Sequence, residues 1–443
     1  MIKLNYFHSL KDKHLKKGLS LNSLNSKKEK VFKKVIINKS RPMMDWVTLP
    51  YQNAAEIEEL ELFGKKISRI YSNFVVLGIG GSALGANAVK QALYKEDGED
   101  KIKIDIIDNV DAERFESLLA DIDYKKTMFN IVTKSGKTVE ILSMFAVVVN
   151  KLKAVLGKDF FINLVVTTER DNVLWNYCEQ NKIKTYEVPK EVGGRYSVLS
   201  PVGLLPMAVM GLELKKVLNG AKAVLENYKQ EPSNKSICMV SATIMYNYFL
   251  QGKKEFVILP YSERLNSMAD FYIQLLSESL GKKDLLNGKP NELFFTPTKA
   301  VGVTYQHSNL QMYQEGSHDR LFFFINLVKH NEDVKIPKFK NAELDALLPK
   351  TLTSLFKAEQ NASSLALKQA GHPSFEINVP SLTEENIGAL LYYFELTTAL
   401  IGEYMQVNTY NQNGVELQKK YTKAIIGVAG FEKENDTLTK MLE

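Results

Sequence analysis

Residues 71–82, YSNFVVLGIGGS, decide the fold class of this chain. The apolar run from Tyr71 to Gly78 predicts a buried strand, and the glycine cluster at its end opens a predicted helix over Ala83 to Tyr94. At such a strand-to-helix turn, backbone N–H groups and the positive end of the helix converge on one point. The unit is therefore typical of a parallel α/β sheet, with a turn suited to a phosphate.

The glycine turn admits more than one ligand. The dinucleotide fingerprint G-x-G-x-x-G would need glycine at position 83, where Ala83 stands, while Asp105 or Asp108 could contact a ribose. This segment alone is compatible with three interpretations: the turn binds a nicotinamide cofactor, it binds a phosphate group, or it binds no ligand.

A second turn of the same kind follows the predicted strand from Met128 to Thr133. Its residues, Lys134-Ser135-Gly136-Lys137-Thr138, place hydroxyl groups and ammonium groups before a long predicted helix. Ligands of parallel sheets bind at the carboxyl ends of the strands, so two such turns predict a sugar-phosphate pocket. Lys134 and Lys137 can also be plain surface charges. The strict nucleotide P-loop, G-x-x-x-x-G-K-[ST], is absent, which disfavours ATP chemistry.

The alternation of strands and helices extends over most of the chain and predicts two α/β domains. Further strands are expected at residues 103–107, 164–167, 236–241, 255–259, 300–304 and 320–327, and a helix at 389–405. We expect each domain to be a three-layer αβα sandwich with a mainly parallel sheet. The predicted division is a basic arm over residues 1–45, domains over 46–220 and 221–405, and a helical tail over 406–443.

Composition limits the class of protein. The 443 residues are 45% apolar and 24% charged, as in ordinary folded proteins. Two cysteines, Cys178 and Cys238, provide no disulfide framework, and no apolar run reaches the roughly 18 residues of a membrane span. We therefore expect a cytoplasmic protein without a membrane partner.

The first 41 residues have a net charge of +10, with twelve basic residues against Asp12 and Glu29, whereas the rest of the chain has a net charge of −4. Such an arm could contact nucleic acid or an anionic membrane. Five leucines interleave with the lysines, namely Leu10, Leu15, Leu19, Leu21 and Leu24. This pattern favours a solvated surface whose leucines pack onto the body of the protein, so we expect no nucleic-acid partner.

Two charged residues outside the phosphate turns are candidates for chemistry. Arg195, in the glycine-rich bend from Glu191 to Ser200, could stabilise an anionic intermediate with its fixed fork of donors, or form a structural ion pair. Glu278 lies in the last turn of a helix predicted over residues 263–280, on one face with Gln274. Glu278 could act as a general base or remain a solvated surface group.

His307 follows a predicted strand and could act as an acid or base, although an isolated histidine is more often structural. The six histidines include no H-x-x-x-H pair on a helix and none lies near a cysteine. We therefore predict no metal site.

Five segments, taken in order, resemble the glucose-6-phosphate isomerase family, also called phosphoglucose isomerase, which is built from two sugar-isomerase domains. The segments are GIGGS, TKSGKTVE, VGGRYSVLSPVGLLP, SESLGK and YNQNGVELQKK, and they span residues 78–420. The resemblance implies reversible isomerisation of glucose 6-phosphate and fructose 6-phosphate through a cis-enediolate, without a metal or other cofactor.

The resemblance also implies a role for each matching residue. Glu278 corresponds to the catalytic base, Arg195 to the arginine that stabilises the intermediate, and His307 and Lys419 to the pair that opens the sugar ring. The remaining matches are substrate-binding positions: Gly80, Gly81, Ser82, Thr133, Lys134, Ser135, Thr138 and Gln274. The chain departs from the family pattern at Lys137, Gln314 and Gln418.

The active enzyme of this family is a homodimer, so the resemblance implies that His307 completes the site of a partner subunit. Two other functions stay open. One is isomerisation of mannose 6-phosphate or another aldose phosphate, and the other is a sugar-phosphate sensor without catalysis.

Overall fold

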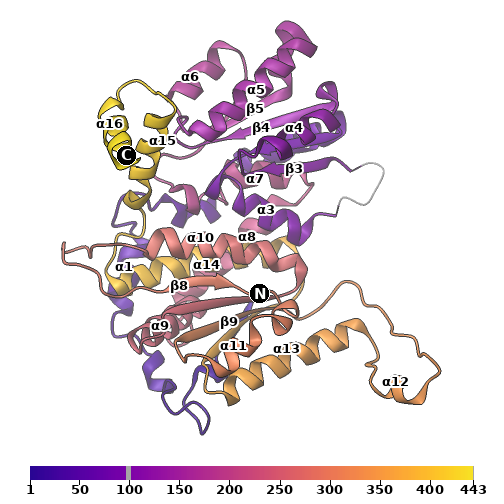
Figure 1. Cartoon of the computed structure of the whole chain (residues 1–443), viewed down its shortest axis with the longest axis vertical. Coiled ribbons are helices and arrows are strands. Elements are labelled where there is room, and N and C mark those ends of the chain that lie inside the picture. Colours follow the sequence, from indigo (N-terminus) through magenta and orange to yellow (C-terminus); the bar gives the residue numbers. More distant parts are fainter. Residues whose placement is uncertain (96–100, 443) are drawn as a thin grey trace.

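The computed structural model of the chain describes residues 1–95 and 101–442. Two five-stranded sheets lie on either side of a shared layer of helices, and further helices cover the outer face of each sheet (Figure 1). Only one strand pair among the described residues is antiparallel. The predicted fold class, two αβα layer structures with mainly parallel sheets, is confirmed.

The first sheet has the strand order β3-β2-β4-β5-β6 and is parallel throughout. Its strands are β2 (Asn73–Leu77), β3 (Lys103–Ile107), β4 (Thr127–Val132), β5 (Leu164–Thr168) and β6 (Lys184–Glu187). Its outer face is covered by α4 (Ala112–Asp121), α5 (Val139–Leu156) and α6 (Val173–Gln180). Along β2, Val75 and Leu77 face these helices, while Phe74 and Val76 face the shared layer. Both faces are thus buried, as a parallel sheet requires.

The second sheet has the order β1-β10-β9-β7-β8. Its strands are β1 (Lys3–Asn5), β7 (Glu255–Tyr261), β8 (Thr296–Lys299), β9 (Arg320–Leu327) and β10 (Ser374–Val379). The edge strand β1 is the antiparallel one. Two helices, α11 (Leu310–Glu315) and α13 (Leu352–Gln369), contribute buried side chains to the outer face of this sheet.

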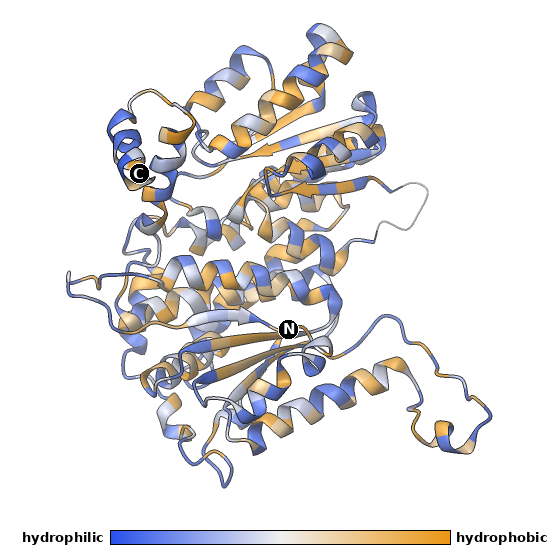
Figure 2. Ribbon diagram, in the orientation of Figure 1, coloured by the Kyte–Doolittle hydropathy of each residue, from blue (hydrophilic) through white to orange (hydrophobic). Residues whose placement is uncertain are grey.

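The shared layer forms the main core of the molecule. It contains α2 (Ala54–Ile70), α3 (Leu84–Leu93), α7 (Pro201–Val209), α8 (Leu214–Gln230), α9 (Ile237–Leu250), α10 (Asn266–Leu280) and α14 (Glu384–Met405). Nearly every residue of α14 is buried, because this helix runs through the middle of the layer. Figure 2 shows apolar residues along the inner strands, whereas the outer helices carry both apolar and polar residues. No helix among the described residues is long and apolar enough to span a bilayer.

The N-terminal segment packs against the shared layer of helices. Leu15, Leu19 and Leu24 are buried in the main core, as expected, whereas Leu21 is exposed. Arg41 forms an ion pair with the buried Glu403 at 2.7 Å, which ties the N-terminal segment to α14. Three further helices are α1 (Glu29–Ile37), α15 (Glu416–Ile425) and α16 (Glu432–Leu442).

Two strand predictions are wrong. Residues 236–241 begin the helix α9, because a helix buried on all sides has no amphipathic period and resembles a buried strand in sequence. The strand expected at 300–304 lies earlier, at β8, and residues 304–307 form a 3₁₀ turn. The sequence analysis also missed β1, β6 and β10. The boundary predicted after residue 220 falls inside α8.

Candidate active site

The two phosphate turns leave the first sheet at one point. Strand β2 pairs with β3 on one side and with β4 on the other, so the chain changes direction across the sheet between β2 and β4. Ligands of open parallel sheets bind outside the carboxyl ends of the strands at such a switch point. Here the turn Gly80–Ser82 follows β2, and residues 133–138 follow β4.

The glycines of the first turn are required by close contacts. Gly80 has a φ of +59°, and a Cβ there would lie 2.8 Å from Nε2 of Gln274. A Cβ on Gly81 would lie 2.3 Å from the carbonyl oxygen of Gly194, beside Arg195. The turn therefore packs directly against the bend that carries Arg195 and against helix α10, where Gln274 lies.

The second turn presents hydroxyl groups at the same edge. The Thr133 and Thr138 hydroxyls lie 2.9 Å apart, and Ser135 is exposed. Lys134 is half-buried, and its ammonium donates to the carbonyl of Lys190 at 2.8 Å. Burial lowers the pKa of Lys134, while nearby carboxylates oppose that shift. Lys137, which could be a surface charge, is exposed.

Asn172 holds this second turn in place, and the sequence analysis missed it. Its side chain donates to the Lys134 carbonyl at 3.2 Å and to the Thr168 hydroxyl at 2.8 Å, and it caps α6 by accepting from Trp175 N–H. The Thr168 hydroxyl donates in turn to the Thr133 carbonyl at 2.6 Å. Asparagine directly before a helix is a common N-cap, so the position of Asn172 before α6 was an available signal.

Arg195 is buried, and four of its five N–H donors are engaged in hydrogen bonds. Nε donates to the Ser279 hydroxyl at 2.7 Å, Nη1 donates to the Gln412 side chain at 2.6 Å, and Nη2 donates to the carbonyls of Thr409 and Asn411. Burial lowers the pKa of Arg195, and the neighbouring Glu278 acts in the opposite direction. The guanidinium is thus held rigidly beside that carboxylate.

The Glu278 carboxylate has one charged and one neutral neighbour. Arg195 Nη1 lies 3.6 Å from Oε2, and Gln274 Nε2 donates to Oε1 at 3.0 Å. The second contact confirms that Gln274 and Glu278 share a face of α10. The Glu278 side chain is 31% exposed, whereas that of Arg195 is 1% exposed. A carboxylate in this position is oriented from one side and open to a ligand on the other.

The opening beside Glu278 is a cleft of about 380 Å³. One wall is the end of α10 and the loop after it, and the other consists of residues 408 and 411–415. Two residues of the cleft, Lys282 and Gln412, received no role in the sequence analysis, although both lie within the family segments. The position of Lys282 just after the helix end at Gly281, where a cation is favoured, was an available signal.

His307 does not reach this cleft within the single chain. It ends the 3₁₀ turn Thr304–His307 after β8 and is exposed. The preceding Gln306 anchors the turn by donating to the Ser363 hydroxyl at 2.7 Å and to Tyr261 at 3.1 Å. No residue of this turn lines the cleft among the described residues.

Lys419 also lies apart from Glu278. Its ammonium pairs with Glu416 at 2.8 Å on the exposed side of α15. Val415, which lines the cleft, lies directly before the start of α15 at Glu416. Of the four predicted catalytic residues, the structure therefore brings together Glu278 and Arg195, and places His307 and Lys419 outside the cleft.

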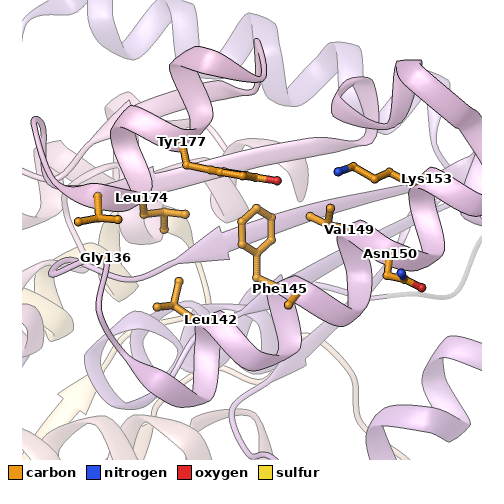
Figure 3. A pocket seen from close by; sticks show the side chains of 10 residues that line it. Gly136, Leu142, Phe145, Val149, Asn150, Lys153, Leu174 and Tyr177 are labelled. Atoms are coloured by element: carbon orange, nitrogen blue, oxygen red, sulfur yellow. The ribbon is translucent and has the colours of Figure 1, made fainter. Parts of the chain in front are cut away.

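A second cavity, of about 440 Å³, lies on the outer face of the first domain (Figure 3). Phe145, Val149, Leu174 and other apolar side chains of α5 and α6 line it, with Lys153 as the charged residue of the lining. It offers no carboxylate or histidine for proton transfer among the residues that the structure describes. Within the same part of the chain, no group of three or more His, Cys, Asp or Glu side chains could hold a metal ion.

Comparison with known proteins shows the family of the chain. A family model described as phosphoglucose isomerase matches residues 56–437. A glucose-6-phosphate isomerase from Carboxydothermus hydrogenoformans is 39% identical over 415 residues, which cover 91% of this chain and 89% of that protein. A glucose-6-phosphate isomerase from Thermus thermophilus is 35% identical over 399 residues, which cover 89% of this chain and 93% of that protein.

Solved structures show the same architecture. The crystal structure of a hypothetical protein from Thermus thermophilus has a TM-score of 0.86 at 32% identity and covers 96% of this chain and 100% of that chain. A glucose-6-phosphate isomerase from Chlamydia trachomatis has a TM-score of 0.77 at 22% identity, covering 90% of this chain and 78% of that chain. At that identity the second likeness concerns the fold alone.

Proposed function

The chain belongs to the phosphoglucose isomerase family, and we propose that Glu278, Arg195 and the two phosphate turns perform its reaction. The chain interconverts glucose 6-phosphate and fructose 6-phosphate. The observation that carries the assignment of residues is the contact of Glu278 with both Arg195 and Gln274 beside an open cleft. Isomerisation moves a proton and an electron pair within one substrate, so this reaction consumes no redox cofactor.

The phosphate group binds at the switch point of the first sheet in this proposal. Ser82, Thr133, Ser135 and Thr138 supply hydroxyl donors there, and the helices that follow both turns point their positive ends toward the same edge. The phosphate takes no part in the bond changes. Its binding energy instead holds the reacting carbons against Glu278.

Proton transfer is assigned to Glu278. The carboxylate removes the proton from C2 of the open-chain aldose to give an enediolate. The hydroxyl proton moves from O2 to O1, and Glu278 returns the carbon-bound proton to C1, which gives the ketose. Arg195 stabilises the negative charge of the enediolate, because its guanidinium is fixed by four acceptors before the charge develops. Gln274 orients the carboxylate through Oε1.

Ring opening is assigned to His307 and Lys419, in keeping with the family resemblance. Lys419 lies in the first turn of α15, which begins directly after the cleft residue Val415, so release of its ammonium from Glu416 would let it turn toward the substrate. His307 is exposed, which fits a residue that acts in a neighbouring subunit.

We also propose that the active form is a homodimer in the cytoplasm. Residues 331–351, including α12 (Ala342–Ala346), project away from the body of the molecule (Figure 1). This projection exposes Phe339 by 67% and Leu347 by 80%. Exposed apolar side chains of this size favour contact with another copy of the chain. Mixing Glu278→Gln with His307→Ala subunits should restore activity if the site is shared, and no recovery would indicate a self-contained protomer.

The assignment of the base is tested by Glu278→Gln, which keeps the shape of the side chain and removes its basicity. We expect kcat to fall by about 10³-fold while fructose 6-phosphate still binds. Glu263→Gln is the matched control, since Glu263 is an exposed glutamate at the opposite end of the same helical segment. If Glu278→Gln kept most of the turnover, the base would have to be another residue.

A further inference from the structure

Lys282 joins the two walls of the cleft. It lies just beyond α10, and its ammonium donates to the carbonyl oxygen of Glu278 at 2.5 Å. The same ammonium donates to the carbonyl oxygen of Asn411 on the opposite wall. One side chain thus connects the last turn of the helix that carries Glu278 with the segment 408–413, which we call the strap.

The strap also holds Arg195. The carbonyls of Thr409 and Asn411 and the side chain of Gln412 all accept hydrogen bonds from its guanidinium. The Asn411 carbonyl is therefore shared by two cations, Lys282 and Arg195. A change in the position of Lys282 would be transmitted through this carbonyl to the guanidinium and through the helix end to the carboxylate.

The charge on this lysine is sensitive to its surroundings. The charged groups that face it are Arg195 from the glycine-rich bend and Glu278 from α10, and Lys283 and Asp284 line the same cleft. Burial first, and then repulsion by Arg195, lower the pKa of Lys282 to about 8, while Glu278 opposes the shift. Two hydrogen bonds to carbonyl oxygens would be lost if the ammonium gave up its charge and turned away.

We propose that Lys282 is a positioning residue of the isomerase site, which clamps the end of α10 to the strap and so holds Glu278 and Arg195 toward the same reacting carbons. The proposal rests on the assignment of isomerase activity to this cleft. Lys282 itself transfers no proton to the substrate.

The experiment compares Lys282→Met and Lys282→Arg with the wild-type enzyme across a pH range of about 6.5 to 9.5, using fructose 6-phosphate. Lys282→Met should lower kcat by about 30-fold with a much smaller change in KM, because misplacing the reacting groups affects the chemical step. Lys282→Arg should recover much of kcat. It should also move the alkaline decline of kcat from near pH 8 to above about pH 9, because a guanidinium stays protonated there. Lys289→Met, an exposed lysine on the same loop, should leave kcat and the pH profile unchanged.

Two results would overturn the proposal: a Lys282→Met enzyme with wild-type kcat, or an alkaline decline that is identical in the wild type and Lys282→Arg. If Lys282→Met fails to fold, as judged by circular dichroism, the pH profile of Lys282→Arg decides alone. Absence of turnover in the wild-type enzyme would instead refute the isomerase assignment, which keeps the two failures distinct.

Discussion

Four strands of each sheet follow the same order, β3-β2-β4-β5 in the first and β8-β7-β9-β10 in the second, but the sheets differ at their switch points. In the first sheet, β2 lies between β3 and β4 and is followed by Gly80, Gly81 and Ser82. In the second, β7 lies between β8 and β9 and is followed by Ser262 and Glu263. The first turn has two glycines and a hydroxyl, which suit a phosphate, whereas the second has no glycine and places the carboxylate of Glu263 beside Ser262, where it would repel a phosphate.

The cation at the second switch point, Arg264, is already hydrogen-bonded within the protein. Arg264 donates through Nε and Nη2 to the carbonyl of Ala92 in the shared layer, so its guanidinium binds a neighbouring helix end. The second domain contributes the far end of the next helix instead, where Glu278 lies. The shared order of four strands thus carries different turns, and in our proposal the turn residues decide which sheet binds the phosphate.

Among the variants that test the different roles of the two sheets, a replacement of Arg195 should lower activity most. Arg195→Lys keeps a positive charge but loses the fork that binds Ser279, Gln412 and the strap. We expect kcat to fall by about 100-fold, as for other preorganised donors to an anionic intermediate. Steady-state kinetics with circular dichroism would separate this loss from unfolding, and a kcat within threefold of the wild type would contradict the role of Arg195.

A smaller effect distinguishes the two switch points directly. Ser82→Ala removes one predicted phosphate donor, so KM for fructose 6-phosphate should rise about tenfold with little change in kcat. Ser262→Ala makes the equivalent change after β7 and should leave KM unaltered. Equal increases in both variants would mean that the second sheet also takes part in binding the substrate.

Replacing His372 should affect activity least. This residue lies at the amino ends of the strands of the second sheet, opposite to the switch point, and contributes to the stability of the fold. Its ring is fully buried and stacks on His318, with ring centroids 4.5 Å apart. Burial, followed by repulsion from His318, Lys253 and Arg320, lowers the pKa of His372 to about 4.

The unfolded chain takes up this proton near pH 6.5, whereas the folded protein resists it until about pH 4. Stability from this group is therefore complete above pH 6.5 and is lost as the pH falls through this interval, by up to about 3 kcal/mol. Urea unfolding at a pH of about 7.5, 6 and 5 should show the decline, and His372→Phe should flatten it. Identical pH dependence in both proteins would assign the decline to other groups.

The sequence predicted the parts of the site that depend on local pattern. Gly80, Gly81 and the turn at 133–138 follow recognisable strands. The four-residue spacing of Gln274 and Glu278 predicted that they share a helix face, and the structure adds the hydrogen bond between them. The contacts of Arg195 with the strap could not be predicted, because more than 200 residues separate them and only tertiary packing brings them together.

For the fold, too, elements with a clear local pattern were predicted and elements without one were not. The strands β2, β5 and β9 were recognisable because buried parallel strands are largely apolar runs. The edge strand β6 has the sequence KTYE, in which polar residues obscure the pattern. The start of α9 was mistaken for a strand, because burial on all sides removes the helical period.

The central claim is that the carboxylate from the second domain shuttles a proton on a sugar whose phosphate is held by the first. It is tested most directly by isomerising fructose 6-phosphate in deuterated water, with a chelator present, and measuring deuterium at C2 of the glucose 6-phosphate formed. The account predicts turnover with deuterium at C2, and loss of both turnover and label in Glu278→Gln. Many turnovers without any label at C2 would contradict it, because hydrogen would then move directly between the carbons without passing through Glu278.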